Sequence, residues 1–219
     1  MTLLDFARGP ALSFAYAVFV FGVAWRLVSL LLLPRNKELS QAKPGAPSVF
    51  SAAVLGFVRH LWPQKAYLRG TLFATLNGYV FHLGLAIIVF GLAQHILVFQ
   101  SLFGINWPNL PSSLISVAAV VTLASLVVAL VRRLTSPVLR LISTGNDYIA
   151  WFVTTLPVIT GLLAVSHLGA PYETLLAIHI LSIALLLIVF PFGKLMHAFL
   201  VFLTRTGTGI FYARRGAEI

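Results

Sequence analysis

Four histidines lie in two of the most apolar stretches of the chain. His82 and His95 belong to the run 76–100, and His179 and His197 belong to the run 173–203. Ionisable side chains are costly inside a bilayer, so in apolar runs they usually mark a functional site. Neutral imidazole is a good axial ligand for haem iron. Two pairs of such histidines therefore have the chemistry to hold two haems.

The spacing of the histidines suggests two levels across a membrane. Eighteen residues separate His179 from His197. On one regular helix these side chains point in nearly the same direction, roughly 27 Å apart, which is close to the ~30 Å of a bilayer's hydrocarbon core. Thirteen residues separate His82 from His95, which turns His95 about 140° away on a regular helix. A π-bulge or local unwinding near Gly91 would re-aim it.

Other roles for these histidines stay open. A histidine in a membrane helix can simply form a hydrogen bond between helices, and a proton relay can also use imidazoles. Relays usually include carboxylates, and Asp147 and Glu173 are the acidic residues near the ends of apolar runs. The chain has no cysteine, which excludes disulfides, thiolate metal sites and covalent c-type haem attachment by this chain.

Composition indicates a protein committed to the membrane. Of the 219 residues, 59% are hydrophobic and only 9% are charged, whereas soluble domains carry about 25% charged residues. Five apolar runs reach the length of a spanning helix, about 20 residues, and they cover residues 11–33, 76–100, 112–131, 148–169 and 173–203. We expect one all-α integral membrane domain, residues 1–219, with five transmembrane helices in a bundle.

The net charge of +10 comes mostly from cations that lie outside the apolar runs, so nucleic-acid binding is not expected. One gap between runs, 34–75, holds Arg35, Lys37, Lys43, Arg59, Lys65 and Arg69. Cations also follow the third run and the fifth, while 101–111 and 170–172 hold none. The positive-inside rule then predicts an outside N-terminus and a cytoplasmic C-terminus. Within 34–75, the apolar segment 48–62 is expected to lie in the interface or against a partner subunit.

This orientation pairs the histidines by depth. His82 and His197 lie toward the cytoplasm, and His95 and His179 lie toward the outside. His167 lies near the outer end of the fourth run, where an imidazole could accept a proton at neutral pH. Arg26 lies within the first run, where it could snorkel to the interface or pair with a haem propionate.

Three stretches of the chain carry a resemblance to a known family. They are FPFGKLMH at 190–197, FHLG at 81–84 and RRLTSPVLRLISTGND at 132–147. Together they resemble the gamma subunit of respiratory nitrate reductase, over five helices from about residue 10 to 215. The superfamily includes the cytochrome b subunits of complexes with heterodisulfide-reductase-like partners, such as those linked to dissimilatory sulfite reductase.

The resemblance implies a dihaem b-type cytochrome in the inner membrane. Such a subunit oxidises quinol from the membrane quinone pool near the outer face and passes electrons inward to a cytoplasmic iron–sulfur subunit of a multisubunit reductase. By position, His82 and His197 match the ligands of the inner haem, and His179 matches one ligand of the outer haem. The family pattern places the fourth ligand where this chain has Leu92. His95 is the nearest substitute.

Several functional alternatives remain beside this expectation. His167 is a candidate for the quinol site. Electron transfer in the sulfur-linked, heterodisulfide-reductase-like branch could run toward quinone instead. A haem-free proton or metal transporter, or a purely structural anchor, would use the histidines differently.

Overall fold

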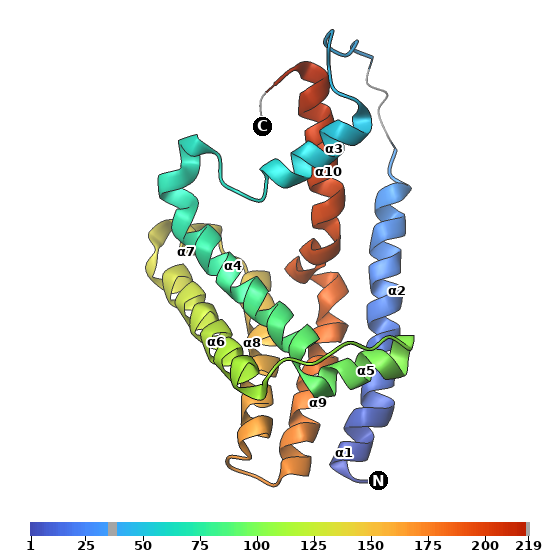
Figure 1. The fold of residues 1–219 in the computed structure, drawn as a ribbon, viewed down its shortest axis with the longest axis vertical. Coiled ribbons are helices and arrows are strands. Elements are labelled where there is room, and N and C mark those ends of the chain that lie inside the picture. The colour runs from blue at the N-terminus through green and yellow to red at the C-terminus, as the bar shows by residue number, and fades with distance from the viewer. Residues whose placement is uncertain (35–38, 218–219) are drawn as a thin grey trace. The chain divides into compact units, whose positions relative to one another are not determined.

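The structure is a computed structural model that describes residues 1–34 and 39–217. Arg35 and Lys37, two of the cations used to predict orientation, lie outside the described residues. Every regular element in the described part of the chain is a helix (Figure 1). The α-helices are α1 (Leu3–Phe6), α2 (Leu12–Leu31), α3 (Val49–Arg59), α4 (Leu68–Gly91), α5 (Ala93–Phe103), α6 (Ser112–Thr135), α7 (Pro137–Ile142), α8 (Gly145–Ser166), α9 (Tyr172–Val189) and α10 (His197–Arg215). The all-α prediction is confirmed.

Five helical segments are long and apolar enough to cross a membrane. They are Leu3–Leu31, Lys65–Gly91, Ser112–Thr135, Gly145–Ser166 and Tyr172–Phe192. Each overlaps one of the five predicted runs, so the prediction of five helices of spanning length and composition is confirmed. The largest differences are in the second and fifth runs, where the helix ends earlier than the apolar sequence does.

The second run is broken because the chain turns after Gly91. Leu92 has an extended backbone, with φ −76° and ψ 129°, and α5 begins at the next residue. The loop after α5 returns to the end of α4, where the Leu110 amide donates to the Gly91 carbonyl at 2.9 Å and the Trp107 indole donates to the Phe90 carbonyl at 2.6 Å. These bonds satisfy carbonyls that the end of a helix leaves without partners. The expected local unwinding near Gly91 is therefore present as a complete helix break.

The fifth run is also interrupted, so the expectation that one regular helix carries both His179 and His197 is wrong. After α9 come two short 3₁₀ turns, η3 (Phe190–Phe192) and η4 (Lys194–Met196), separated by an extended Gly193. Pro191 lacks the amide hydrogen that an α-helix needs and its ring clashes with the preceding turn. The α-helical segment resumes at His197 and continues to Arg215.

The chain forms two compact units, which are described separately. The first contains residues 1–18 and 76–189. In it, α8 packs against α9 and α6 packs against α8, while α1 and the π-helical turn η1 (Ala7–Ala11) pack on α9. Many buried residues at these contacts are small, such as Ala118, Ala164, Ala177 and Ala184. Small residues let membrane helices approach closely without a large apolar core.

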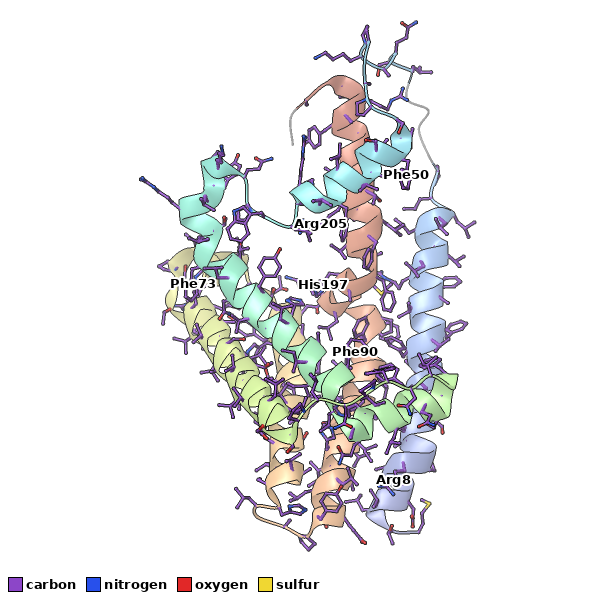
Figure 2. All side chains as sticks on the ribbon, viewed as in Figure 1. Arg8, Phe50, Phe73, Phe90, His197 and Arg205 are labelled. Atoms are coloured by element: carbon purple, nitrogen blue, oxygen red, sulfur yellow. The ribbon has the colours of Figure 1, made fainter. Side chains whose placement is uncertain are left out.

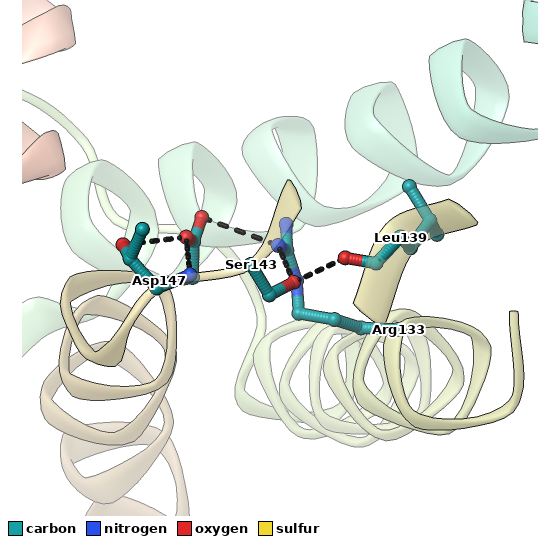
Figure 3. Close-up of polar contacts among 5 residues, drawn as sticks. Arg133, Leu139, Ser143 and Asp147 are labelled. Carbon is teal, nitrogen blue, oxygen red and sulfur yellow. Dashed lines mark hydrogen bonds and ion pairs between the residues drawn. The ribbon is translucent and has the colours of Figure 1, made fainter. Parts of the chain in front are cut away.

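Polar contacts join the end of α6 to the start of α8 in the first unit (Figure 3). The Arg133 guanidinium donates to the Ser143 hydroxyl at 2.8 Å and pairs with Asp147 at 3.2 Å. Asp147 also accepts the Thr144 amide in a capping box at the start of α8. Arg133 therefore has a structural partner within the same unit.

The second unit contains residues 19–75 and 190–219, and its described part is built around α10. Helix α3 lies across α10 (Figure 1), with Gly56 and Gly209 at the crossing. A Cβ added at Gly209 would come within 2.6 Å of the Gly56 Cα and 2.5 Å of the Ala52 carbonyl oxygen. The apolar segment 48–62 thus forms helix α3, which packs on α10 of the same chain at two glycines whose missing side chains allow the backbones to approach.

Candidate functional site

The first unit brings two of the four apolar histidines together. His95 lies on α5 and His179 on α9, and their ring centroids are 6.2 Å apart with an angle of 18° between the ring planes. The turn at Leu92 places His95 on a separate helix, so the angular mismatch expected on a continuous helix does not arise. The predicted pairing of His95 with His179 thus has a geometric basis in the structure.

Each of these two rings is held through its Nδ1 atom. His95 Nδ1 lies 3.0 Å from the Ile88 carbonyl on the last turns of α4. A carbonyl can only accept, so His95 donates Nδ1–H and its Nε2 carries the lone pair. Metal-ligating histidines commonly donate their second nitrogen to a carbonyl in this way, which fixes the tautomer and the ring orientation.

His179 is oriented by a hydroxyl on the neighbouring helix. Its Nδ1 lies 3.1 Å from the Thr160 hydroxyl of α8, and that hydroxyl donates to the Leu156 carbonyl at 2.9 Å. Because Thr160 has one proton to donate, it accepts from His179 Nδ1–H, which again leaves the lone pair on Nε2. Ser182 lies 3.0 Å from the Thr160 hydroxyl and donates to the His179 carbonyl at 2.6 Å. Both hydroxyl residues are buried.

Gly161 has no side chain, which allows the His179 ring to pack against α8. A Cβ added at Gly161 would lie 3.1 Å from the ring Cε1 and 3.4 Å from Nδ1. The distance to Cε1 is tighter than most packed contacts, so a larger residue at this position requires the imidazole to shift by a few tenths of an ångström. Neither Gly161 nor the hydroxyl pair was among the predicted site residues. The sequence signal that could have identified Thr160 and Ser182 is that they are polar residues inside apolar runs.

The centroid separation of this histidine pair is close to that expected for two imidazoles that would ligate one metal ion. An imidazole nitrogen bonds a metal at about 2.0–2.1 Å, so two imidazoles on opposite sides of one ion place their centroids about 6 Å apart. The observed separation is 6.2 Å. In the described part of the chain, no three His, Asp or Glu side chains cluster as a metal site. A haem needs only two ligands from the protein because the porphyrin supplies the others.

The other two predicted ligands, His82 and His197, belong to different units. His82 Nδ1 donates to the Gly78 carbonyl at 2.7 Å, and the Phe81 ring lies 4.7 Å from the imidazole. His197 Nδ1 donates to the Lys194 carbonyl at 2.8 Å. Both histidines therefore have the tautomer that places the lone pair on Nε2. That they share an inner haem stays a prediction.

His197 lines an open pocket of ≈ 620 Å³ within the second unit. Arg26, Lys194 and Arg205 line the same pocket. The Arg205 guanidinium also donates to the His60 carbonyl. Arg26 and Lys194 are cations that could contact a propionate on the basis of the sequence, and the structure places Arg205 in the same cavity.

The remaining predicted site residue, His167, lies at the C-cap of α8. Its backbone has φ 55° and ψ 29°, a left-handed conformation that is uncommon for residues other than glycine. Its ring centroid is 5.1 Å from that of Tyr172, at the start of α9. His167 and Tyr172 therefore lie together at the α8–α9 end of the first unit, where an exposed imidazole could exchange protons.

Comparison with known proteins gives one clear relationship. The chain is 32% identical over 214 residues to a curated protein of Nitratidesulfovibrio vulgaris (strain Hildenborough), across 96% of this chain and 94% of that protein. The description of that protein is simply "Protein" and states no activity. No protein-family model matches the chain, and no solved structure matches it. The chain belongs to the same family as this N. vulgaris protein.

Proposed function

We propose that the chain is a dihaem cytochrome b that anchors a respiratory complex in the inner membrane. It carries electrons between the membrane quinone pool and a cytoplasmic iron–sulfur subunit. The observation that supports this most strongly is the pair of parallel imidazoles from α5 and α9, whose centroids are 6.2 Å apart. The resemblance of residues 81–84, 132–147 and 190–197 to the nitrate reductase gamma subunit supports it independently.

In this proposal, His95 and His179 hold one b haem and His82 and His197 hold the other. Bound haem supplies a one-electron carrier between a two-electron quinol and single-electron iron–sulfur centres. Thr160 and the Ile88 carbonyl keep the outer ligands in one tautomer through their Nδ1 bonds.

Quinol oxidation releases two protons, and His167 is the candidate acceptor at the outer face. Its imidazole lies at the exposed end of α8, beside Tyr172. Tyr172 is seven residues before His179 on α9, so the two side chains share a helix face about 10 Å apart along the axis. This separation would keep the proton acceptor close to the outer haem. Electron transfer in the opposite direction, toward quinone as in the sulfur-linked branch, would use the same residues.

The first experiment asks whether the purified chain binds haem. We expect two b haems per polypeptide and a reduced-minus-oxidised absorption difference. A His95→Ala or His179→Ala variant should lose one of them, while His60→Ala should keep both, because His60 lies outside the five candidate spans and donates Nδ1 to the Gly56 carbonyl. A folded wild-type chain without haem would refute the proposal. Proton or metal flux across liposomes in that haem-free protein would then favour a transporter.

A second experiment separates quinol chemistry from haem binding. We expect His167→Gln to retain both haems but to slow their reduction by a quinol analogue, with a changed pH profile. Unchanged reduction kinetics at every pH would remove His167 from the proposed quinol site without affecting the haem assignment.

A further inference from the structure

Helix α3 is apolar on two opposite faces. Ala52 and Gly56 are buried on the face that packs on α10. Phe50, on the first turn of α3 (Figure 2), is followed at four-residue spacing by Val54 and Val58. At 100° per residue, this row lies on the opposite side of the helix from Ala52 and Gly56. Its side chains are 79%, 45% and 54% exposed, and we call these three residues the α3 stripe.

The orientation of α3 is fixed by its contacts with α10. The Phe57 ring stacks on the Phe202 ring, with centroids 5.5 Å apart and an angle of 9° between the ring planes. The Arg205 guanidinium donates to the His60 carbonyl at the end of α3. The α3 stripe cannot turn toward α10 without the loss of these contacts. Its apolar surface therefore needs a second apolar environment.

Helix α3 is too short to cross a bilayer. Its 11 residues extend about 17 Å, whereas the hydrocarbon core is ~30 Å thick. In the chain it lies between two candidate spans, Leu3–Leu31 and Lys65–Gly91. The second span begins six residues after α3 ends, and six residues reach at most about 20 Å. The end of α3 is therefore tethered near the point where this span would enter a membrane.

The connection that follows α3 has the residue types of a membrane surface. Arg59, Lys65 and Arg69 are exposed, and none of them forms an ion pair in the described part of the chain. Trp62 and Tyr67 lie among these cations and are also exposed. Indole and phenol rings favour the boundary between lipid headgroups and acyl chains. Clustered cations next to an apolar segment are attracted to anionic lipids.

The charge of the second unit also indicates an anionic partner. Its acidic residues, Glu38 and Glu218, lie outside the described residues. Over residues 19–34, 39–75 and 190–217, the charged side chains are therefore all cationic at neutral pH. A surface that covers the α3 stripe should be apolar where it meets the stripe and anionic beside it. A leaflet that contains anionic phospholipid has both properties.

We propose that the α3 stripe lies in the headgroup–acyl boundary of the membrane and that Arg59 and Lys65 contact the headgroups of anionic phospholipids. The link of α3 to a candidate span on each side favours lipid over a partner protein as the occupant. This inference goes beyond the proposed function and does not depend on haem.

The test relies on the absence of cysteine from the chain. Phe50→Cys and Val58→Cys are each labelled with a benzophenone maleimide in the full-length chain. Phe21→Cys is the control, because Phe21 is an exposed residue of α2 within a candidate span. Each protein is irradiated in vesicles of equal parts phosphatidylcholine and phosphatidylglycerol, and also in the membranes in which it was produced. Mass spectrometry then identifies what is attached to the labelled peptide.

The contribution of charge is measured with the double variant Arg59→Gln/Lys65→Gln, combined with Val58→Cys or with Phe21→Cys. Circular dichroism checks that every variant is folded. We expect phospholipid adducts at all three labelled positions. With Val58→Cys, phosphatidylglycerol adducts should exceed phosphatidylcholine adducts several-fold, because each cation near an anionic surface favours it by about fivefold. The double variant should lower this ratio to the value found with Phe21→Cys, which should not change.

Three results would overturn the inference. Attachment of Val58→Cys to a polypeptide, whether a second copy of the chain or another subunit, would make the α3 stripe a protein interface. Lipid adducts with Phe21→Cys but none with Phe50→Cys or Val58→Cys would place the stripe in water. The same lipid ratio with and without Arg59 and Lys65 would show that these cations do not select anionic lipid. A chain without haem would refute the proposed function but would leave all three outcomes readable.

Discussion

The two candidate histidine sites are built in opposite ways. In the first unit, His95 and His179 come from helices far apart in sequence and are oriented by neutral groups, the Ile88 carbonyl and the Thr160 hydroxyl. In the second unit, His197 lines an open pocket, and most of the pocket's lining residues come from the stretch 193–205. Arg26, Lys194 and Arg205 line the same pocket and give it positive charge. The surroundings of His95 and His179 are neutral and buried between helices, whereas those of His197 are open and cationic.

This difference indicates how each site would fail. Neutral hydrogen bonds buried between helices cannot be replaced by water, so a small change in packing should disturb the first site. Charges around an open pocket are screened by solvent and salt, so the second site should tolerate packing changes and respond to charge removal and ionic strength. Variants in each unit can therefore test whether the two sites are independent.

The largest expected effect comes from removing one ligand in each unit. His179→Ala should abolish one haem and leave the other, and His197→Ala should do the reverse. Spectra and potentiometric titrations of the two variants should then add up to the wild-type pattern. Loss of both haems in each variant, with the protein still folded by circular dichroism, would contradict independent sites.

A smaller effect is expected from Thr160→Val. The substitution keeps the shape but removes the hydroxyl oxygen that accepts from His179 Nδ1, so the buried ring loses one of its hydrogen-bond partners. Loss of such an orienting group typically lowers metal-site affinity by about 10–100-fold. The haem affinity is measured by titration of the apoprotein with haem. Thr154→Val is a matched control on α8, because the Thr154 hydroxyl bonds to the Ala150 carbonyl of its own helix. Equal affinities in both variants would exclude an orienting role for Thr160.

Gly161→Ala tests the packing of the same ring without removing a polar group. The new Cβ would lie 3.1 Å from His179 Cε1, so the imidazole must shift. We expect a several-fold loss of affinity for one haem and an altered electron paramagnetic resonance signal. Gly145→Ala is the control, since nothing lies within 4 Å of a Cβ there. An unchanged signal in Gly161→Ala would mean that the ring has room that the structure does not show.

The smallest effect is expected from Asp147→Asn. The Arg133–Asp147 pair is partly exposed, with side-chain exposures of 32% and 8%, and such pairs usually contribute about 0–1 kcal/mol. The thermal midpoint should fall slightly, measured by the loss of helical signal, and haem content should not change. A loss of haem in this variant would show that the α6–α8 connection supports the first site directly.

Much of the fold follows from local sequence, and the histidine pairing does not. Long apolar runs predict the five candidate spans because a bilayer imposes a minimum helix length. The interruption at residues 190–196 also has a local signal in Pro191 and Gly193, although the hydrophobic run continues through it as if it were one helix. The C-terminal extension of α10 to Arg215 was not anticipated, since its later turns are polar.

The approach of His95 to His179 depends on features that are not local. It requires the turn at Leu92, which is stabilised by Leu110 and Trp107 from the following loop, and the packing of α8 on α9 that brings Thr160 to the ring. The spacing of His82 and His95 reveals their mismatch on a regular helix and predicts an irregularity near Gly91. It could not identify the residues that hold the imidazoles in place, because their partners come from other helices.

The most direct test of the account is an experimental density map of the purified protein at a resolution that shows side chains. We predict a porphyrin between α5 and α9, with iron bonded to His95 Nε2 and His179 Nε2 and with Nδ1 of His179 donating to the Thr160 hydroxyl. A map in which these two imidazoles contact each other, water or lipid, with no macrocycle between them, would contradict it.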